Sequence, residues 1–297
     1  MLFRTMVESD LDPILTCLDT PSVNTTTRQR FVDYLKSGSY RPEWTWLALD
    51  GDWIAGLAIW WGFPAGDRPL ALDALYSPPS IADPVPLWTE LIQRVPPPVE
   101  YHIFTLPGRR DDPAIAARLA AATAAGLSTL TERLRYEWTA DVPLPARSTR
   151  LRFAADPDDE AFVEVFQRIS EGSLDVATRA GVGRVGARAH AEEDVADYKL
   201  MPGPRDRWRL AYDASGELVG CALPSANDGG PVVGYLGVLP AHRGHGYVDD
   251  LLAEITWLLA ADGSTCIRAD TDTTNLPMAA AFDRAGYRVF AIRLVAS

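Results

Sequence analysis

The chain alternates short apolar stretches, whose pattern suits β-strands, with amphipathic stretches that suit helices. The same order of elements occurs twice within the 297 residues. A strand before an acidic helix start, a strand–turn–strand unit, and an alanine-rich helix that ends at a glycine before a closing strand all recur. The paired segments are 3–14 with 151–162, 44–60 with 206–223, and 119–138 with 278–295. The sequence therefore predicts two copies of one fold.

The two copies are predicted to be separate domains, residues 1–142 and 150–297. The connecting residues 142–149 hold two prolines and small polar side chains, which suit a short extended linker. We expect each domain to be α/β, with a mixed, mostly antiparallel central sheet flanked by helices. In the second domain the apolar run 231–240 predicts a central strand buried on both faces. Residues 264–271 predict the next, largely parallel strand.

Composition narrows the classes of function. A net charge of -12 argues against a nucleic-acid partner, which needs a basic face, and is compatible with a cationic small molecule such as an amine. The apolar runs are shorter than the roughly 18 residues of a membrane span, and the start lacks the order of a signal peptide, so we expect a cytoplasmic protein with no membrane partner. The scattered cysteines and histidines predict neither disulfides nor a metal site. The oligomeric state stays open.

A glycine-rich turn, residues 243–246, leads from the predicted central strand of the second domain into a helix. Gly244 and Gly246 lack a Cβ, so the backbone can curl and approach a ligand closely. The first amides of a helix have no internal partners and favour an anion, and Arg243 can add a charge-assisted hydrogen bond to a phosphate. The turn therefore predicts a pyrophosphate site built mostly from main-chain amides. A purely structural turn is the alternative.

The turn and the residues after it resemble the acyl-CoA-binding motif of the GNAT superfamily, the GCN5-related N-acetyltransferases. That motif has Gln or Arg, two residues, Gly, one residue, and Gly or Ala; Val248 departs from it at the last position. Asn275 and the pair 286–287 extend the resemblance, although Asn275 also suits a helix N-cap. The resemblance implies an acyl-CoA cosubstrate bound by these residues: Leu236, Gly237, Val238, Arg243, Gly244, His245, Gly246, Tyr247, Val248, Asn275 and Met278.

The first domain lacks this turn. With Pro78 placed on Pro240, Ile81 stands at the position of the arginine, and Ala82 and Pro84 stand at the positions of the two glycines. Proline removes a donor N–H, so this loop cannot form the same anion site. We therefore expect the first domain to be a degenerate copy.

The residues that carry out the reaction are less clearly indicated. The family position that often holds a tyrosine, which protonates the leaving thiolate, is Phe282 here. The candidate general bases are Asp228, Tyr235, and Asp270 or Asp272. His190, Glu192 and Glu193 fall where the family builds its acceptor wall and either meet a cationic amine or form a solvated helix face.

The resemblance implies a tandem GNAT protein whose second domain transfers an acyl group, with acetyl-CoA as the first expectation, directly to a small amine. Two alternatives remain at this point. One is an acyltransferase on the same fold that uses an aminoacyl-tRNA, which the acidic composition disfavours. The other is a non-catalytic CoA sensor, which Phe282 and the lack of an obvious base favour.

Overall fold

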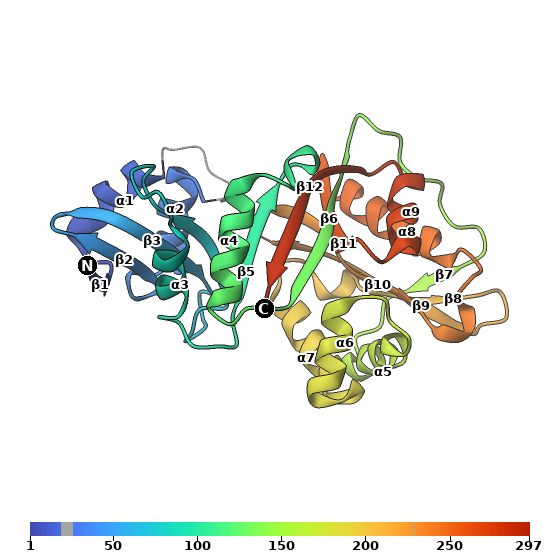
Figure 1. Cartoon of the computed structure of the whole chain (residues 1–297). Helices are drawn as coiled ribbons and strands as arrows, with labels where there is room; N and C mark the ends of the chain where they lie inside the picture. The colour runs from blue at the N-terminus through green and yellow to red at the C-terminus, as the bar shows by residue number, and fades with distance from the viewer. Residues whose placement is uncertain (19–25, 228) are drawn as a thin grey trace. The chain divides into compact units, whose positions relative to one another are not determined.

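The computed structural model describes residues 1–18, 26–227 and 229–297, so the candidate base Asp228 lies outside the described residues. The chain forms two compact units, coloured from blue to red along the sequence in Figure 1. Unit 1 is Met1–Arg133 with Ala291–Ser297, and unit 2 is Leu134–Phe290. Among the described residues, no helix combines the length and apolar character that crossing a lipid bilayer demands.

Unit 1 is a mixed sheet with helices packed against it. The strand order is β1-β2-β3-β4-β5-β12. Neighbouring strands run antiparallel except β4 and β5, which run parallel. The strands are β1 (Leu2–Thr5), β2 (Thr45–Asp50), β3 (Trp53–Trp61), β4 (Ala71–Tyr76), β5 (Glu100–Thr105) and the later part of β12 (Arg288–Ala296). The helices are α1 (Leu11–Cys17), α2 (Arg28–Ser37), α3 (Val85–Ile92) and α4 (Pro113–Ala124).

Unit 2 repeats this plan, with strand order β6-β11-β10-β9-β8-β7. Helices α5, α6 and α7 cover one face of its sheet, and α8 and α9 cover the other (Figure 1). The strands are β6 (Leu130–Thr139, largely in this unit), β7 (Arg152–Ala154), β8 (Arg209–Tyr212), β9 (Leu218–Asn227), β10 (Gly230–Val238) and β11 (Cys266–Asp272). The helices are α5 (Asp159–Ser170), α6 (Val176–Val185), α7 (Ala187–Leu200), α8 (Tyr247–Ala261) and α9 (Leu276–Arg284).

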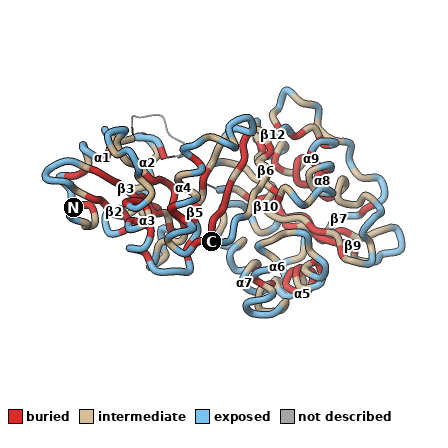
Figure 2. Tube along the Cα trace, viewed as in Figure 1, coloured by how far each residue is buried: buried red, intermediate tan, exposed pale blue. Residues whose placement is uncertain are grey.

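The core of each unit lies between its sheet and its helices, and the buried residues follow the strands in Figure 2. In unit 1 the apolar core includes Phe31 from α2, Tyr40 from the loop after α2 and Leu57 from β3. In unit 2 one apolar cluster lies under α8 and α9, and another lies under α5 and α7. The expected α/β class, a mostly antiparallel sheet flanked by helices, is confirmed.

The closing strands do not stay with the repeat that encodes them. The last seven residues belong to unit 1, where β12 pairs antiparallel with β5, Leu294 opposite Ile103 and Ala296 opposite Tyr101. The first repeat in turn gives the end of β6, from Leu134 onward, to unit 2. The domains 1–142 and 150–297 describe the sequence repeats and stay a prediction. The compact units are divided differently because the repeats exchange their closing strands.

Candidate active site

The central strand of unit 2 parts from its neighbour in the middle of the sheet. β10 pairs with β9 along its length, but among the described residues its parallel register with β11 is limited to Val232 opposite Arg268. A bulge between Val233 and Tyr235 follows at once, and a Cβ on Gly234 would collide with β9. Bulges of this kind re-aim main-chain groups and are common beside active sites.

The divergence changes the burial of β10. The sequence predicts a strand buried on both faces, and this prediction is wrong, because every residue of the strand except Gly237 is only half-buried. A Cβ on Gly237 would lie 2.6 Å from Ile169 of α5, so one face of the strand is tightly covered. On the side of β11, beyond Val232, the ladder has ended. Past Val232, β10 therefore has no ladder partner on the side of β11 among the described residues, and its residues there are half-buried except Gly237.

The glycine-rich turn lies between the end of β10 and the start of α8. Gly244 and Gly246 have φ of 84° and 72°, in the left-handed region that favours glycine. Gly246 caps α8 without any side-chain hydrogen bond to the first-turn amides. A Cβ on Gly244 would meet nothing within 4 Å, so the turn faces open space. A helix start without a side-chain cap behind an open glycine turn suits an anion, and the predicted pyrophosphate is one such anion.

Arg243 does not reach outward toward such a ligand. Its guanidinium donates to the carbonyl of Val238 (3.1 Å), to that of Ile169 (2.7 Å) and to that of Glu171 (2.7 Å). The fork therefore joins the end of β10 to the end of α5. The expectation that Arg243 donates to a phosphate finds no support in this geometry, because carbonyl groups already occupy the donors.

The two aspartates in the first turn of α8 are neutralised by arginines. Asp249 accepts a two-pronged contact from Arg284, with the shortest distance 2.7 Å. Asp250 pairs with Arg150 at 2.6 Å, and Arg150 also donates to the carbonyl of His245 at 2.8 Å. An anion at the helix start therefore meets paired rather than bare carboxylates. Arg150 has no signal in the sequence, because its partners lie about a hundred residues away in the chain.

The residues that follow β11 shape the same end of the unit. Asn275 caps α9 and accepts from the amide of Met278 at 3.4 Å, so the N-cap interpretation of Asn275 holds. The departure from the family motif, Val248, packs against the core under α8 instead of filling the turn. The other predicted cofactor residues that pack against this core, all partly buried, are Leu236, Val238, Tyr247 and Met278.

Two candidate bases are already engaged by the fold. The buried Asp272 accepts the amide N–H of Val176 at 2.6 Å and so fixes the start of α6 to the end of β11. Tyr235 stacks on Phe166 with ring centroids 4.1 Å apart, and burial raises the pKa of Tyr235 well above its ordinary value. Burial disfavours the charged form of this phenol, and the role of Tyr235 as a base stays a prediction. Asp270 is half-buried on β11.

Acids of α7 lie near both ring nitrogens of His190. Glu192 pairs with Arg188 and Glu193 pairs with Arg184, and their exposure agrees with a solvated helix face for these two residues. His190, with 12% of its side chain exposed, has Nδ1 4.0 Å from Glu193 and Nε2 3.5 Å from Asp194. Asp194, one turn after His190, is a residue the sequence analysis missed.

Phe282 is a core residue. It is 2% exposed and stacks on Tyr136 of β6 with ring centroids 4.7 Å apart. The hydroxyl that related enzymes often place at this position is replaced by an aromatic packing contact. This position of the chain therefore supplies no hydroxyl that could act as an acid.

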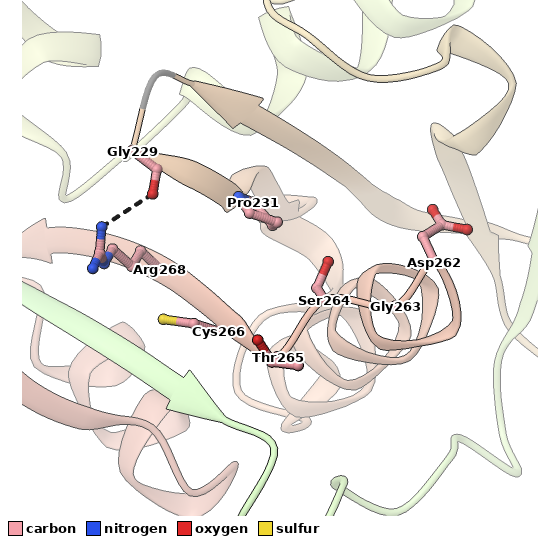
Figure 3. Close-up of a pocket in the computed structure, with 8 residues that line it drawn as sticks. All are labelled: Gly229, Pro231, Asp262, Gly263, Ser264, Thr265, Cys266 and Arg268. Carbon is pink, nitrogen blue, oxygen red and sulfur yellow. Dashed lines mark hydrogen bonds between the residues drawn. The ribbon is translucent and has the colours of Figure 1, made fainter.

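A shallow depression of about 380 Å³ lies at the opposite end of the two diverging strands (Figure 3). The starts of β10 and β11 and the loop after α8 form its walls, and Arg268 reaches across to the carbonyl of Gly229 at 3.0 Å. The turn 243–246 lies beyond the other end of these strands. We therefore do not connect this depression with the predicted cofactor.

Three side chains with metal-ligating atoms come together at the β8–β9 turn: Asp213, Glu217 and His242. One oxygen of Asp213 already accepts the main-chain amides of Ser215 and Glu217, as in a local turn. Glu217 is largely exposed. The absence of a metal stays a prediction.

Comparison with known proteins agrees with this geometry. Residues 184–287 match the family described as the acetyltransferase (GNAT) family. Residues 184–287 of the second unit therefore resemble this family, and the whole chain has the tandem GNAT fold. No curated protein matches the sequence.

Solved structures resemble the full chain. A GCN5-related N-acetyltransferase from Sphaerobacter thermophilus is 16% identical, with a TM-score of 0.62 over 99% of this chain and 94% of its own. A tandem GNAT protein from the clavulanic acid biosynthesis pathway is 18% identical, with a TM-score of 0.56 over 99% and 98%. A GNAT-family acetyltransferase from Colwellia psychrerythraea is 14% identical, with a TM-score of 0.51 over 100% and 99%.

Proposed function

We propose that unit 2 is an acyl-CoA-dependent N-acyltransferase that transfers the acyl group directly to a small amine, with acetyl-CoA as the first cosubstrate to test. The observation that carries the proposal is the turn 243–246, where two left-handed glycines open the uncapped start of α8 beside the divergence of β10 and β11. The first-turn amides would hold the pyrophosphate. The main chain of Leu236, Gly237 and Val238 would meet the pantetheine arm.

The proposal gives unit 1 no cofactor. Its loop after β4 carries Ile81, Ala82 and Pro84 in place of the arginine and glycines, and α3 begins after a proline cap. The proposal places the protein in the cytoplasm, without a membrane partner. It also includes no nucleic-acid partner, because the chain carries a net charge of -12 and no basic face is expected.

Calorimetric titration with acetyl-CoA, followed by a thiol-release assay over a panel of primary amines, tests the proposal. We expect one binding site per chain and release of CoA thiol with a subset of the amines. Failure to bind acetyl-CoA or any other acyl-CoA would refute the proposal. Binding without turnover on any amine would favour a CoA sensor. Turnover only with an aminoacyl-tRNA would favour the acyltransferase that uses an aminoacyl-tRNA.

A further inference from the structure

One face of α7 carries three polar side chains at intervals of four residues: His190, Asp194 and Tyr198. Such spacing places them on the same side of the helix, one turn apart. Tyr198 donates its hydroxyl hydrogen bond to the carbonyl of Gly234, at 3.0 Å, in the bulge of β10. This face of α7 therefore lies against β10 at the bulge, where β10 separates from β11. Asp194 lies one helical turn from that contact.

The imidazole of His190 lies in a space that α6 leaves for it. A Cβ on Gly181 of α6 would come within 2.4 Å of the imidazole Cε1, so only glycine admits the ring at this distance. The Nε2 of His190 is 3.5 Å from the Asp194 carboxylate. Both ring nitrogens are buried, and neither makes a hydrogen bond within the part of the chain that the structure describes. The side chains of His190 and Asp194 are therefore close to each other, but no hydrogen bond among the described residues fixes the imidazole.

The surroundings of this pair are acidic. Burial raises the pKa of Asp194 to about 6, and the charge of His190 acts in the opposite direction. The charges of Asp197 on α7, of Asp175 at the start of α6, and of Glu193, which also pairs with Arg184, raise it further. From β10 the Tyr235 phenol faces the same charges of Asp194 and Asp175. A cation beside Asp194 would be attracted by several carboxylates at once.

We propose that Asp194, supported by His190, receives the ammonium group of the acceptor and takes its proton, so that the acceptor is a small primary amine that arrives positively charged. The inference rests on the acyl transfer proposed above. The Asp272 carboxylate at the end of β11 is already bound to the Val176 amide, whereas no hydrogen bond within the described residues fixes the imidazole beside Asp194.

The chemistry balances without a further reactant. The ammonium gives one proton to the Asp194 carboxylate, and the freed lone pair forms the C–N bond at the thioester carbonyl while the C–S bond breaks. A second N–H proton moves to the departing CoA sulfur. Asp194 then releases its proton to water, with His190 acting as a positioning residue that also sets the charge balance. The sum is an amide, free CoA thiol and one proton.

The test compares wild type with Asp194→Asn, His190→Gln and a control, Glu164→Gln, which makes the same kind of change at an exposed carboxylate of α5. We expect Asp194→Asn to lower kcat/KM for the amine by about 10²- to 10⁴-fold, the range for a lost general base. Its acetyl-CoA affinity should stay that of wild type. The rise of kcat/KM with pH near about 6 that we expect of wild type should be absent in this variant. Glu164→Gln should behave as wild type in all three respects.

The His190→Gln variant gives a second measurement, which a purely structural role of His190 would leave unchanged. Because the charged imidazole lowers the pKa of Asp194, its removal should shift the rising limb of the pH profile to higher pH, with a similar plateau. Thermal melting checks folding. The folded pKa of Asp194 is raised above its unfolded value of 3.8, so stability falls as pH rises between 3.8 and about 6. The uncharged Asp194→Asn should therefore melt above wild type at neutral pH.

The outcomes are separable. A wild-type protein that acylates amines while Asp194→Asn keeps its kcat/KM and its rising limb would overturn the assignment and leave the proposed function standing. A wild-type protein that binds no acyl-CoA would overturn both. An Asp194→Asn variant that loses acetyl-CoA affinity along with turnover would also count against the assignment, because it would show a general structural effect.

Discussion

At the scale of single residues, Arg243 illustrates how a motif residue can act through the fold. Its planar guanidinium reaches the carbonyls of Val238, Ile169 and Glu171 in one arrangement, so it holds the end of α5 against the end of β10. Lysine offers a point charge without the fork and cannot reproduce these contacts together. The influence of Arg243 on a ligand at the turn is therefore expected to pass through the position of the turn itself.

Replacing Arg243 should lower stability and cofactor affinity together. Arg243→Ala removes several charge-assisted hydrogen bonds, and we expect the free energy of unfolding to fall by about 2 kcal/mol, with acetyl-CoA affinity reduced in calorimetry. Arg243→Lys should recover only part of both. Arg109→Ala, at an exposed ion pair in unit 1, should change stability by less than about 1 kcal/mol. Lost affinity with unchanged stability would show that Arg243 contacts the ligand directly.

The role of a residue could be predicted from the sequence where its partners lie near it in the chain. The left-handed glycines of the turn and the Asn275 cap follow from neighbouring residues in the chain. The carbonyl partners of Arg243 and the pairing of Arg150 with Asp250 join segments about seventy and a hundred residues apart, which no local pattern encodes. Asp194 was overlooked because its role depends on which face of α7 packs against β10.

At the scale of elements, the start of α8 depends on backbone conformation more than on side chains. Gly244 has open space where a Cβ would stand, so a substitution there tests only its left-handed φ of 84°. Gly183 in α6 also has open space, but it lies in an ordinary helical turn. The two glycines form a matched pair that differs in conformation alone.

Alanine at these two positions should act in opposite directions. Gly244→Ala forces an L-residue into the left-handed region and should destabilise by about 1 kcal/mol, with weaker acetyl-CoA binding because the turn amides shift. Gly183→Ala should stabilise by about 0.5 to 1 kcal/mol and leave binding unchanged. Denaturant unfolding and calorimetry measure both effects. Equal binding by the two variants would argue against the turn as the anion site.

The element order was largely predictable, whereas the burial of β10 was not. The apolar run from 231 indicated a strand covered on both faces, yet the strand is half-buried. The difference arises because β11 leaves the ladder after Val232, a feature of the strand pair that the sequence of one strand cannot reveal. The bulge marked by Gly234 lies at that same point.

At the scale of the whole molecule, the exchanged closing strands decide which pieces of chain can fold. Unit 1 needs Ala291–Ser297 as the partner of β5, and unit 2 needs the end of β6 from Leu134. The repeats in the sequence could be recognised from their patterns. The exchange could not, since the apolar pattern of a closing strand does not show which of the two sheets it joins.

Cutting the chain in the linker should therefore leave two incomplete sheets. We expect the fragment 1–142 alone to lack a cooperative thermal transition, because β5 loses its neighbour and its edge is unpaired. A fragment that joins residues 1–133 to 291–297 through a flexible linker should regain that transition. Circular dichroism during heating measures both. A cooperative transition in 1–142 alone would contradict the requirement for the C-terminal strand.

The position of β12 also affects how the protein is made. An N-terminal domain commonly folds while the ribosome is still extending the chain. Here the residues that complete the first unit, Ala291–Ser297, leave the ribosome only after unit 2. At about 5 to 20 residues per second, synthesis of the residues from the end of β5 to Ser297 takes on the order of 10 to 40 seconds, during which β5 waits with an open edge. Translation that stops early leaves unit 1 without its last strand and also shortens unit 2. Cellular quality control can therefore recognise either unit as incomplete.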